Sequence, residues 1–152
     1  MVKGDSMEIF EAGHTKKEGV QYVFRECCYG IAEKDGKLML VYSDKDKNYS
    51  VPGGGIEKGE DLEVALKREF LEETGYIVTK AEHFIDVHSS GRNSKDVYVE
   101  QFSHIFKVEV DESSKIVPLE NWHTPGYYTK EEVKNLVKSY WQTRFFEEIL
   151  KL

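Results

Sequence analysis

One segment of this 152-residue chain, residues 54–76, constrains its fold and chemistry more than any other. It reads GGIEKGEDLEVALKREFLEETGY and carries seven polar or glycine positions in the spacing G-x5-E-x7-R-E-U-x-E-E-x-G-U, where U is apolar. These positions are Gly54, Glu60, Arg68, Glu69, Glu72, Glu73 and Gly75. At average residue frequencies the seven letters would coincide on the order of once in 10⁸ starting positions. The spacing is therefore a functional motif.

The second half of the segment predicts a helix of roughly 13 residues. Apolar residues recur there at the three- and four-residue spacing of one buried face, namely Leu62, Ala65, Leu66 and Phe70. Asp61 is suited to the N-cap, because its side chain can accept a hydrogen bond from the first turn. Gly75 is suited to the C-cap, where a left-handed backbone is common. Before the helix, Gly53–Gly55 allow a close approach of the backbone to a ligand.

Three glutamates of this helix share one surface. Glu69 lies three residues before Glu72 and four before Glu73. Like charges at this spacing destabilise a helix by a few tenths of a kcal/mol per pair. A hard divalent cation such as Mg²⁺ would offset that repulsion, since carboxylates and phosphate oxygens are its usual ligands. A solvated acidic face is the alternative, but it does not explain why Glu60 and Arg68 stand in register with the cluster.

The rest of the chain predicts strands around this helix. We expect strands over Tyr22–Ala32, Lys37–Tyr42, Ala81–Val87 and Val97–Val110. Asp35-Gly36 predicts a tight hairpin between the first two. We expect loops over His88–Asp96 and Asp111–Pro125. Thr129 and Glu132 form a capping box that opens a second helix, either long or broken once. The order strands, helix, strands, helix predicts an α+β fold.

The motif resembles that of the Nudix hydrolases, which cut a pyrophosphate linkage in a nucleoside diphosphate joined to another group. The resemblance implies an α/β/α sandwich with a mixed, largely antiparallel sheet between helices, and Mg²⁺ or Mn²⁺ as cofactor. It implies metal ligands at Gly53, Glu69, Glu72 and Glu73, with Glu60 and Arg68 orienting the acidic groups. A nucleotide-sensing domain that binds without turnover is the alternative, but such a domain has no need of the acidic residues.

The base that activates water has two candidate locations. In enzymes of this kind it is a glutamate of the motif, here Glu72 or Glu73, or a glutamate on a later loop. Glu120 is the loop candidate, because partial burial beside Trp122 would suit a base. Glu100 is a poorer candidate, because it lies within a predicted strand.

Substrate contacts are expected outside the motif. Arg25 and Arg92 are candidates for phosphate oxygens, and Tyr49 for stacking on a base. Each has an ordinary alternative, a solvated arginine or a core aromatic. None of the five histidines has metal-ligand spacing, so none is assigned a role. The proline that marks ADP-ribose specificity in the family is replaced by Gly91 and Arg92, and a nucleoside triphosphate is the default substrate.

Length and charge bound the remaining possibilities. A chain of 152 residues fits one domain, 1–152. Its net charge of −7 disfavours nucleic acid as a partner, because phosphate contacts need a basic surface. No apolar run has the length of a signal peptide within Met1–Val20, or of a membrane span elsewhere. With two adjacent cysteines, Cys27 and Cys28, expected as free thiols, we expect a cytoplasmic protein. A homodimer is left open.

Overall fold

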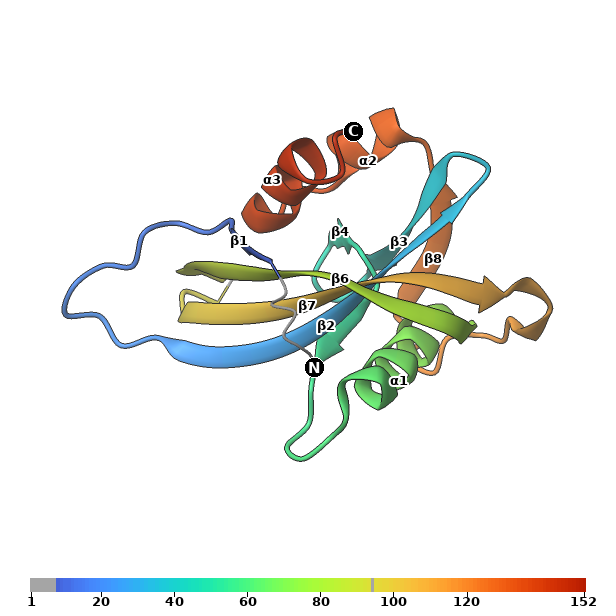
Figure 1. The fold of residues 1–152 in the computed structure, drawn as a ribbon, viewed down its shortest axis with the longest axis horizontal. Coiled ribbons are helices and arrows are strands. Elements are labelled where there is room, and N and C mark those ends of the chain that lie inside the picture. The colour runs from blue at the N-terminus through green and yellow to red at the C-terminus, as the bar shows by residue number, and fades with distance from the viewer. Residues whose placement is uncertain (1–7, 94) are drawn as a thin grey trace.

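The structure is a computed structural model, and it describes residues 8–93 and 95–152. Ser94 and the first seven residues of the Met1–Val20 stretch lie outside the described residues. Figure 1 shows helix α1 (Leu62–Thr74) on one face of a sheet and helices α2 (Lys130–Leu136) and α3 (Tyr140–Glu148) on the other. The predicted α/β/α sandwich is confirmed.

Eight strands in the described residues form the sheet, in the order β1-β6-β7-β2-β3-β4, with β5 added to β2 and β8 to β3. The strands are β1 (Ile9–Glu11), β2 (Val23–Lys34), β3 (Lys37–Ser43), β4 (Asn48–Ser50), β5 (Gly53–Gly55), β6 (Ile77–Arg92), β7 (Tyr98–Asp111) and β8 (His123–Tyr128). The pairs β1–β6 and β2–β7 are parallel, and the other pairs are antiparallel. A mixed, largely antiparallel sheet was expected and is confirmed.

The turn between β2 and β3 follows from its two residues. Asp35 has φ 52° and Gly36 has φ 76°. Two successive positive φ angles make a turn whose twist matches that of the flanking strands, and Asp-Gly is a favoured sequence for it. The predicted hairpin is confirmed.

The prediction for β6 was too short. The strand begins at Ile77, and the segment expected as a loop from His88 to Asp96 continues it as far as Arg92. Ser89, Ser90 and Gly91 pair with Gln101, Glu100 and Val99 of β7. Backbone hydrogen bonds between strands need no apolar side chains, so a polar sequence conceals this part of the strand.

Short strands also escaped prediction. β8 lies within and beyond the segment Asp111–Pro125 that was expected to be irregular, and its sequence HTPGYY contains a proline and a glycine. Among the described residues it pairs only with β3, and proline is tolerated on such an edge strand. Asp111 ends β7, and the rest of that segment is a short 3₁₀ helix, Glu112–Ser114, and a loop.

Helix α1 has the predicted limits. The Asp61 side chain accepts a hydrogen bond from the Glu63 N–H at 3.2 Å. Gly75 has φ 78°, and its N–H donates to the Leu71 carbonyl. Side chains of the predicted apolar face are buried against β2 and β7, namely Ala65, Leu66 and Phe70. The charged side chains Glu69 and Glu73 lie next to this face and are themselves largely buried.

The C-terminal helical region is broken once. Three residues, 137–139, separate the end of α2 at Leu136 from the start of α3 at Tyr140. Val133, Val137, Phe145 and Phe146 are buried on the sheet face opposite α1. Cys27 and Cys28 are free and buried in β2, as expected. Within residues 8–93 and 95–152, no helix combines the length and the apolar character needed to cross a membrane.

The start of α2 gives a stability prediction with a matched control. The Thr129 side chain accepts from the Glu132 N–H at 3.1 Å, and the Glu132 carboxylate accepts from the Thr129 N–H at 2.8 Å. Thr129→Ala removes half of this capping box and should lower the free energy of unfolding by about 1 kcal/mol in chemical denaturation. Ser139 holds the N-cap of α3 but makes no capping hydrogen bond. Ser139→Ala should therefore change the free energy by less than about 0.5 kcal/mol, and equal losses in both variants would contradict the assignment.

Candidate functional site

Arg68 is the centre of the charged face of α1. Its Nε and Nη2 donate to the two oxygens of Glu60 at 2.7 and 2.8 Å. Its Nη1 donates to Glu69 at 3.0 Å and to Glu72 at 3.1 Å. Its Nη2 also donates to the Gly55 carbonyl at 3.1 Å. One planar guanidinium thus joins the helix, the loop before it and strand β5.

Glu60 is fixed from two sides. Besides Arg68, the Glu57 N–H donates to its Oε1 at 2.9 Å. The hydrogen bond from Arg68, together with that N–H, lowers the pKa of Glu60 to about 2. Glu60 therefore stays ionised and serves as the fixed partner of Arg68 across the working pH range.

The glycines of β5 lie against the carboxylates of α1. A Cβ on Gly54 would lie 2.4 Å from Oε2 of Glu69, so any larger residue there would displace that carboxylate. The Gly53 N–H donates to Oε1 of Glu73 at 2.9 Å. Gly53 has φ 152°, and a Cβ there would lie 2.1 Å from the Cys28 carbonyl oxygen. Gly53 is therefore needed for the close approach of β5 to β2, and Gly54 leaves room for the Glu69 carboxylate.

Two of the helix carboxylates are held in a poorly solvated place. Burial raises the pKa of Glu73 to about 8, although the Gly53 N–H opposes the shift. Burial also raises the pKa of Glu69, with the hydrogen bond from Arg68 opposing it. Both shifts are caused mainly by loss of water around a negative charge. A bound cation would reverse them.

The loop between the 3₁₀ helix and β8 brings Glu120 to the same place. Its backbone N–H donates to the Glu72 carbonyl at 3.0 Å, and the Ile116 N–H donates to the Gly75 carbonyl at 2.9 Å. The loop is thus attached to the C-terminal end of α1. Glu120 is half-buried there and raises the pKa of both Glu69 and Glu73 through its charge.

His123 belongs to this site, and no role was predicted for it. Its Nε2 lies 3.6 Å from Oε2 of Glu73, and its Nδ1 lies 3.2 Å from Oε1 of Glu120. The Nδ1 atom is buried, and the described residues offer it no well-aligned hydrogen bond. Some 50 residues separate His123 from α1 in sequence, so no local spacing could have revealed the contact.

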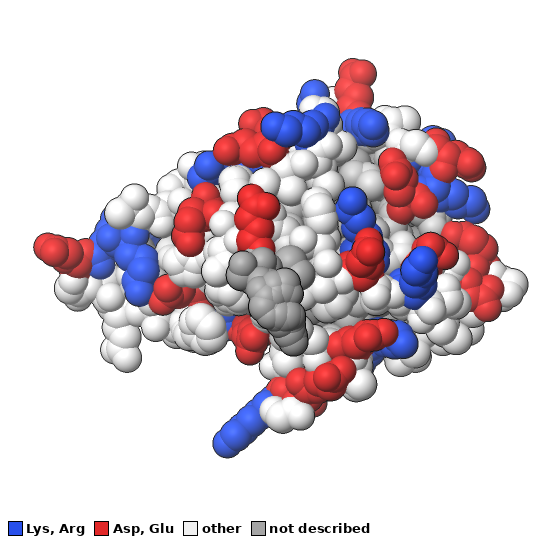
Figure 2. All heavy atoms as spheres, in the orientation of Figure 1, with Lys and Arg blue, Asp and Glu red and all other residues white. Residues whose placement is uncertain are grey.

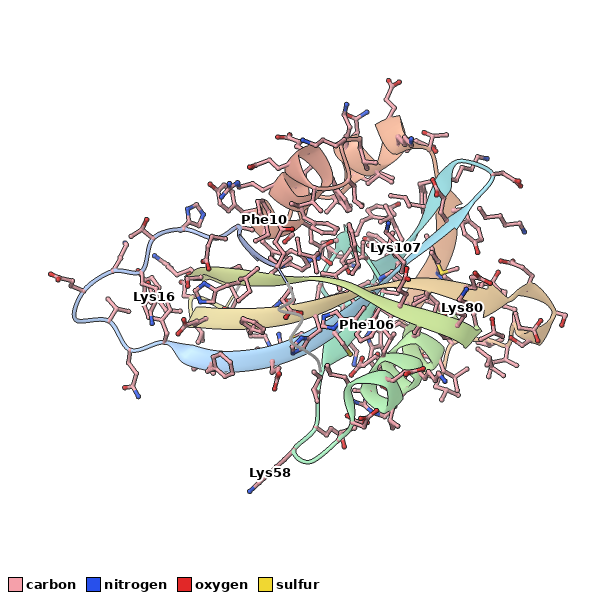
Figure 3. All side chains as sticks on the ribbon, viewed as in Figure 1. Phe10, Lys16, Lys58, Lys80, Phe106 and Lys107 are labelled. Carbon is pink, nitrogen blue, oxygen red and sulfur yellow. The ribbon has the colours of Figure 1, made fainter. Side chains whose placement is uncertain are left out.

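The donor atoms suit a hard divalent cation. The Glu69 and Glu73 carboxylates lie beside the backbone of β5, and Arg68 joins Glu69 to Glu72. Ligand atoms of Glu73, Glu120 and His123 all lie within 4.8 Å of one another. Oxygen-rich sets of this kind match Mg²⁺ and Mn²⁺. Figure 2 shows acidic side chains over α1 and the loop before it, with basic side chains among them, including one at the tip of the loop that Figure 3 labels as Lys58.

The three predicted substrate residues lie in different places. Arg25 is exposed on β2, and its Nη2 lies next to the glycine strand β5. This atom is 3.4 Å from the position that a Cβ on Gly55 would take. Tyr49 packs on Tyr42 and Tyr128, with ring centroids 4.9 and 5.7 Å away, at the edge of the apolar core. The structure therefore brings only Arg25 beside the motif.

Arg92 is remote from the motif. It lies at the far end of β6 and forms an ion pair with Asp96. Asp86 of β6 pairs with His104 of β7, and His104 pairs with Cys28 of β2. Cys28 pairs in turn with Gly54, so Asp86 and Gly54 lie at the same level across the sheet. Arg92 lies six residues further along β6 than Asp86. At about 3.3 Å per residue, this places Arg92 about 20 Å from the level of Gly54. The structure does not bring Arg92 together with the carboxylates.

Comparisons with known proteins show which family this chain resembles. The NUDIX domain profile matches residues 25–147. An ADP-ribose pyrophosphatase of Methanocaldococcus jannaschii is 42% identical over 67 residues, which are 40% of this chain and 37% of that protein. An RNA pyrophosphohydrolase of Caulobacter vibrioides is 57% identical over 44 residues, 27% of this chain and 26% of that protein. The chain thus matches less than two fifths of the length of these curated relatives.

Solved structures show the same fold. The mutator MutT protein of Bacillus halodurans superposes with a TM-score of 0.68 at 21% identity, over 84% of this chain and 83% of that one. At this identity the likeness concerns the fold alone. The matched profile covers most of the chain and includes the glycine strand, α1 and the Glu120 loop. The chain belongs to the Nudix family.

Proposed function

We propose that this protein hydrolyses a pyrophosphate linkage in a nucleoside diphosphate joined to another group, with Mg²⁺ or Mn²⁺ as cofactor. The observation that carries the proposal is the meeting of the Glu73 carboxylate with Glu120 and His123 beside β5, with Glu69 and Glu72 held by Arg68 on the same helix. A cation held by Glu69, Glu72, Glu73 and the Gly53 carbonyl would supply charge neutralisation at the substrate phosphates and acidify a bound water.

Arg68 and Glu60 orient these groups in the proposed reaction. Arg68 fixes one oxygen each of Glu69 and Glu72, so the remaining carboxylate oxygens are left for a cation. Glu60 occupies the other edge of the guanidinium and keeps Arg68 from turning toward the substrate. Arg25, beside Gly55, is placed to donate to a phosphate oxygen.

Glu120 is our choice for the base. It would accept a proton from the water that attacks phosphorus; the new P–O bond forms as the bond to the leaving phosphate breaks. Its loop is attached to α1 through the Glu72 carbonyl, which fixes its distance from the helix. His123, 3.2 Å from Oε1 of Glu120, would position that carboxylate. Glu72 and Glu73 are the alternatives.

The substrate class rests partly on the relatives. The names of the two curated relatives, ADP-ribose pyrophosphatase and RNA pyrophosphohydrolase, both describe cleavage of a pyrophosphate. We propose a small nucleotide, with a nucleoside triphosphate and ADP-ribose as the first two to test. Two buried free cysteines support action in the reducing cytoplasm, and we propose that residues 1–152 act as one domain.

A screen of nucleotides and nucleotide sugars with Mg²⁺ and Mn²⁺ tests the proposal, with released phosphate or pyrophosphate as readout. A domain that only senses nucleotides would bind one of them without releasing product. Binding without turnover under every metal condition would therefore reject the hydrolase proposal.

The metal-facing carboxylates give the main mutational prediction. Glu69→Gln and Glu73→Gln should each lower kcat by at least about a hundredfold, because they remove charge but keep shape. Glu63 is a matched control on the same helix, exposed and paired with Lys67. Glu63→Gln should stay within about twofold of wild type. Near-normal turnover in Glu69→Gln or Glu73→Gln would reject the metal assignment.

Metal removal gives a second prediction. Excess EDTA should abolish turnover, and added Mg²⁺ or Mn²⁺ should restore it, because the proposed ligands are hard oxygens. Circular dichroism before and after chelation checks that the fold is kept. Undiminished turnover in excess chelator would overturn the mechanism.

The base is tested by Glu120→Gln. If Glu120 activates water, this change should lower kcat by about a hundredfold or more and leave KM nearly unchanged. Glu112 is a control from the same connection between β7 and β8, where it accepts from the Tyr127 hydroxyl and pairs with Lys34. Glu112→Gln should have little effect on kcat. A kcat within threefold of wild type for Glu120→Gln would move the role to Glu72 or Glu73.

The raised pKa of Glu73 predicts a pH effect on the metal-free protein. The folded state keeps the Glu73 proton up to about pH 8, whereas the unfolded chain releases it near 4.5. The unfolded state therefore binds fewer protons in this window, so this group makes the free energy of unfolding fall as pH rises from about 4.5 to 8. In chelated samples the decline should be smaller for Glu73→Gln. Equal pH slopes for the two proteins would contradict the shift.

A further inference from the structure

A second cluster of ligating side chains lies on the α1 side of the sheet, outside the Nudix motif. It consists of His83 and Asp86 from β6 and His104 from β7, with Glu26 of β2 beside it. The His83 ring stacks on Phe106 with centroids 4.9 Å apart. Phe106, labelled near the middle of the sheet in Figure 3, belongs to the apolar cluster under α1. The cluster therefore continues that core toward the other end of the strands.

Three different ligand atoms converge there. Oδ1 of Asp86 lies 2.7 Å from Nε2 of His83 and 2.8 Å from Nδ1 of His104. The ligand atoms of the three residues all lie within 4.8 Å of one another. Asp86 and His104 are buried, and His83 is half-buried. Two imidazoles and a carboxylate are thus gathered at the edge of the core.

A backbone irregularity makes this convergence possible. His83 and Asp86 are three residues apart, so in a regular strand they would point to opposite faces of the sheet. The register between β6 and β7 shifts between His83 and Ile85, which is a β-bulge. The extra residue returns His83 to the face of Asp86. Bulges often re-aim a side chain at a functional position.

The surroundings of His104 match those of a histidine that binds a metal. Its Nδ1 faces Asp86, and its Nε2 lies 2.7 Å from Oε2 of Glu26. Histidine ligands in metal sites usually donate the second ring nitrogen to a carboxylate, which fixes the ring orientation. Glu26 is in turn placed by the sheet, since its carbonyl accepts from the Ile56 N–H at 2.9 Å.

We propose that His83, Asp86 and His104 form a second metal site, which binds Zn²⁺ or a similar first-row transition metal, with Glu26 orienting His104. Two imidazoles and one carboxylate are a usual ligand set for Zn²⁺, with water completing the coordination. The same set is poor for Mg²⁺, which prefers oxygen ligands alone. The two sites of this protein would therefore select different metals.

His88 supplies a control on the same strand and the same face. Its Nδ1 lies 2.6 Å from Glu11, and its Nε2 lies 2.7 Å from Glu100. These carboxylates contact opposite nitrogens of one ring, so they cannot converge on a single ion. His88 therefore resembles the cluster in composition but lacks its geometry.

Zn²⁺ uptake by the full chain tests the proposal, measured by calorimetry in excess Mg²⁺ so that the glutamate site is occupied. The wild-type protein should bind one equivalent of Zn²⁺. His83→Phe keeps the stacking on Phe106, removes a ligand and should weaken binding at least tenfold. Glu26→Gln should weaken Zn²⁺ binding about ten- to a hundredfold, as substitutions of residues that hydrogen-bond to a metal ligand typically do. His88→Gln should bind like wild type.

Co²⁺ absorption gives a second readout. Co²⁺ in a site with two imidazole ligands and low coordination number absorbs visible light strongly, whereas Co²⁺ among six oxygens absorbs weakly. The strong bands should appear in wild type and in His88→Gln and be lost in His83→Phe and His104→Gln. If His104→Gln does not fold, the absorption of His83→Phe tests the site, because the His83 side chain is only half-buried. Absence of Zn²⁺ binding in wild type, or equal binding in His83→Phe, would overturn the proposal.

Discussion

The site depends on one guanidinium. Arg68 donates to Glu60, Glu69, Glu72 and the Gly55 carbonyl, so it opposes the repulsion among carboxylates crowded on one helix face. Lysine could neutralise charge there, but its ammonium cannot supply a planar fork that bonds in several fixed directions. Because its partners lie on the helix, the preceding loop and β5, the position of the glycine strand relative to α1 also follows from this residue.

Features encoded by neighbouring residues could be predicted from the sequence. The limits of α1, the Asp35-Gly36 hairpin and the capping box at Thr129 each depend on side chains within a few positions of the backbone that they fix. The glutamates of α1 could likewise be expected on one surface, because helical spacing alone places them there. Their roles as ligands stay a prediction.

Features that depend on distant parts of the chain could not be predicted. His123 joins Glu73 and Glu120 only because β8 pairs with β3, and the sequence of β8 hides that pairing. The histidines of β6 and β7 showed no ligand spacing, because a bulge and a strand pairing, not local spacing, bring them together. Glu120 was the loop candidate beside Glu72 and Glu73, and its attachment to α1 appears only in the structure.

The parallel pairing of β2 with β7 has a consequence for how the molecule assembles. Val23 pairs with Val99, 76 positions later, and the ladder continues through Ala32 and Val108. Bringing such distant residues together costs chain entropy before their contacts form, and this slows folding. A nascent chain ending before β7 would already contain the whole Nudix motif, yet it would lack the strand in the centre of the sheet and the loop that carries Glu120. The residues of the proposed site are therefore brought together only after β7 and the loop that carries Glu120 have been synthesised.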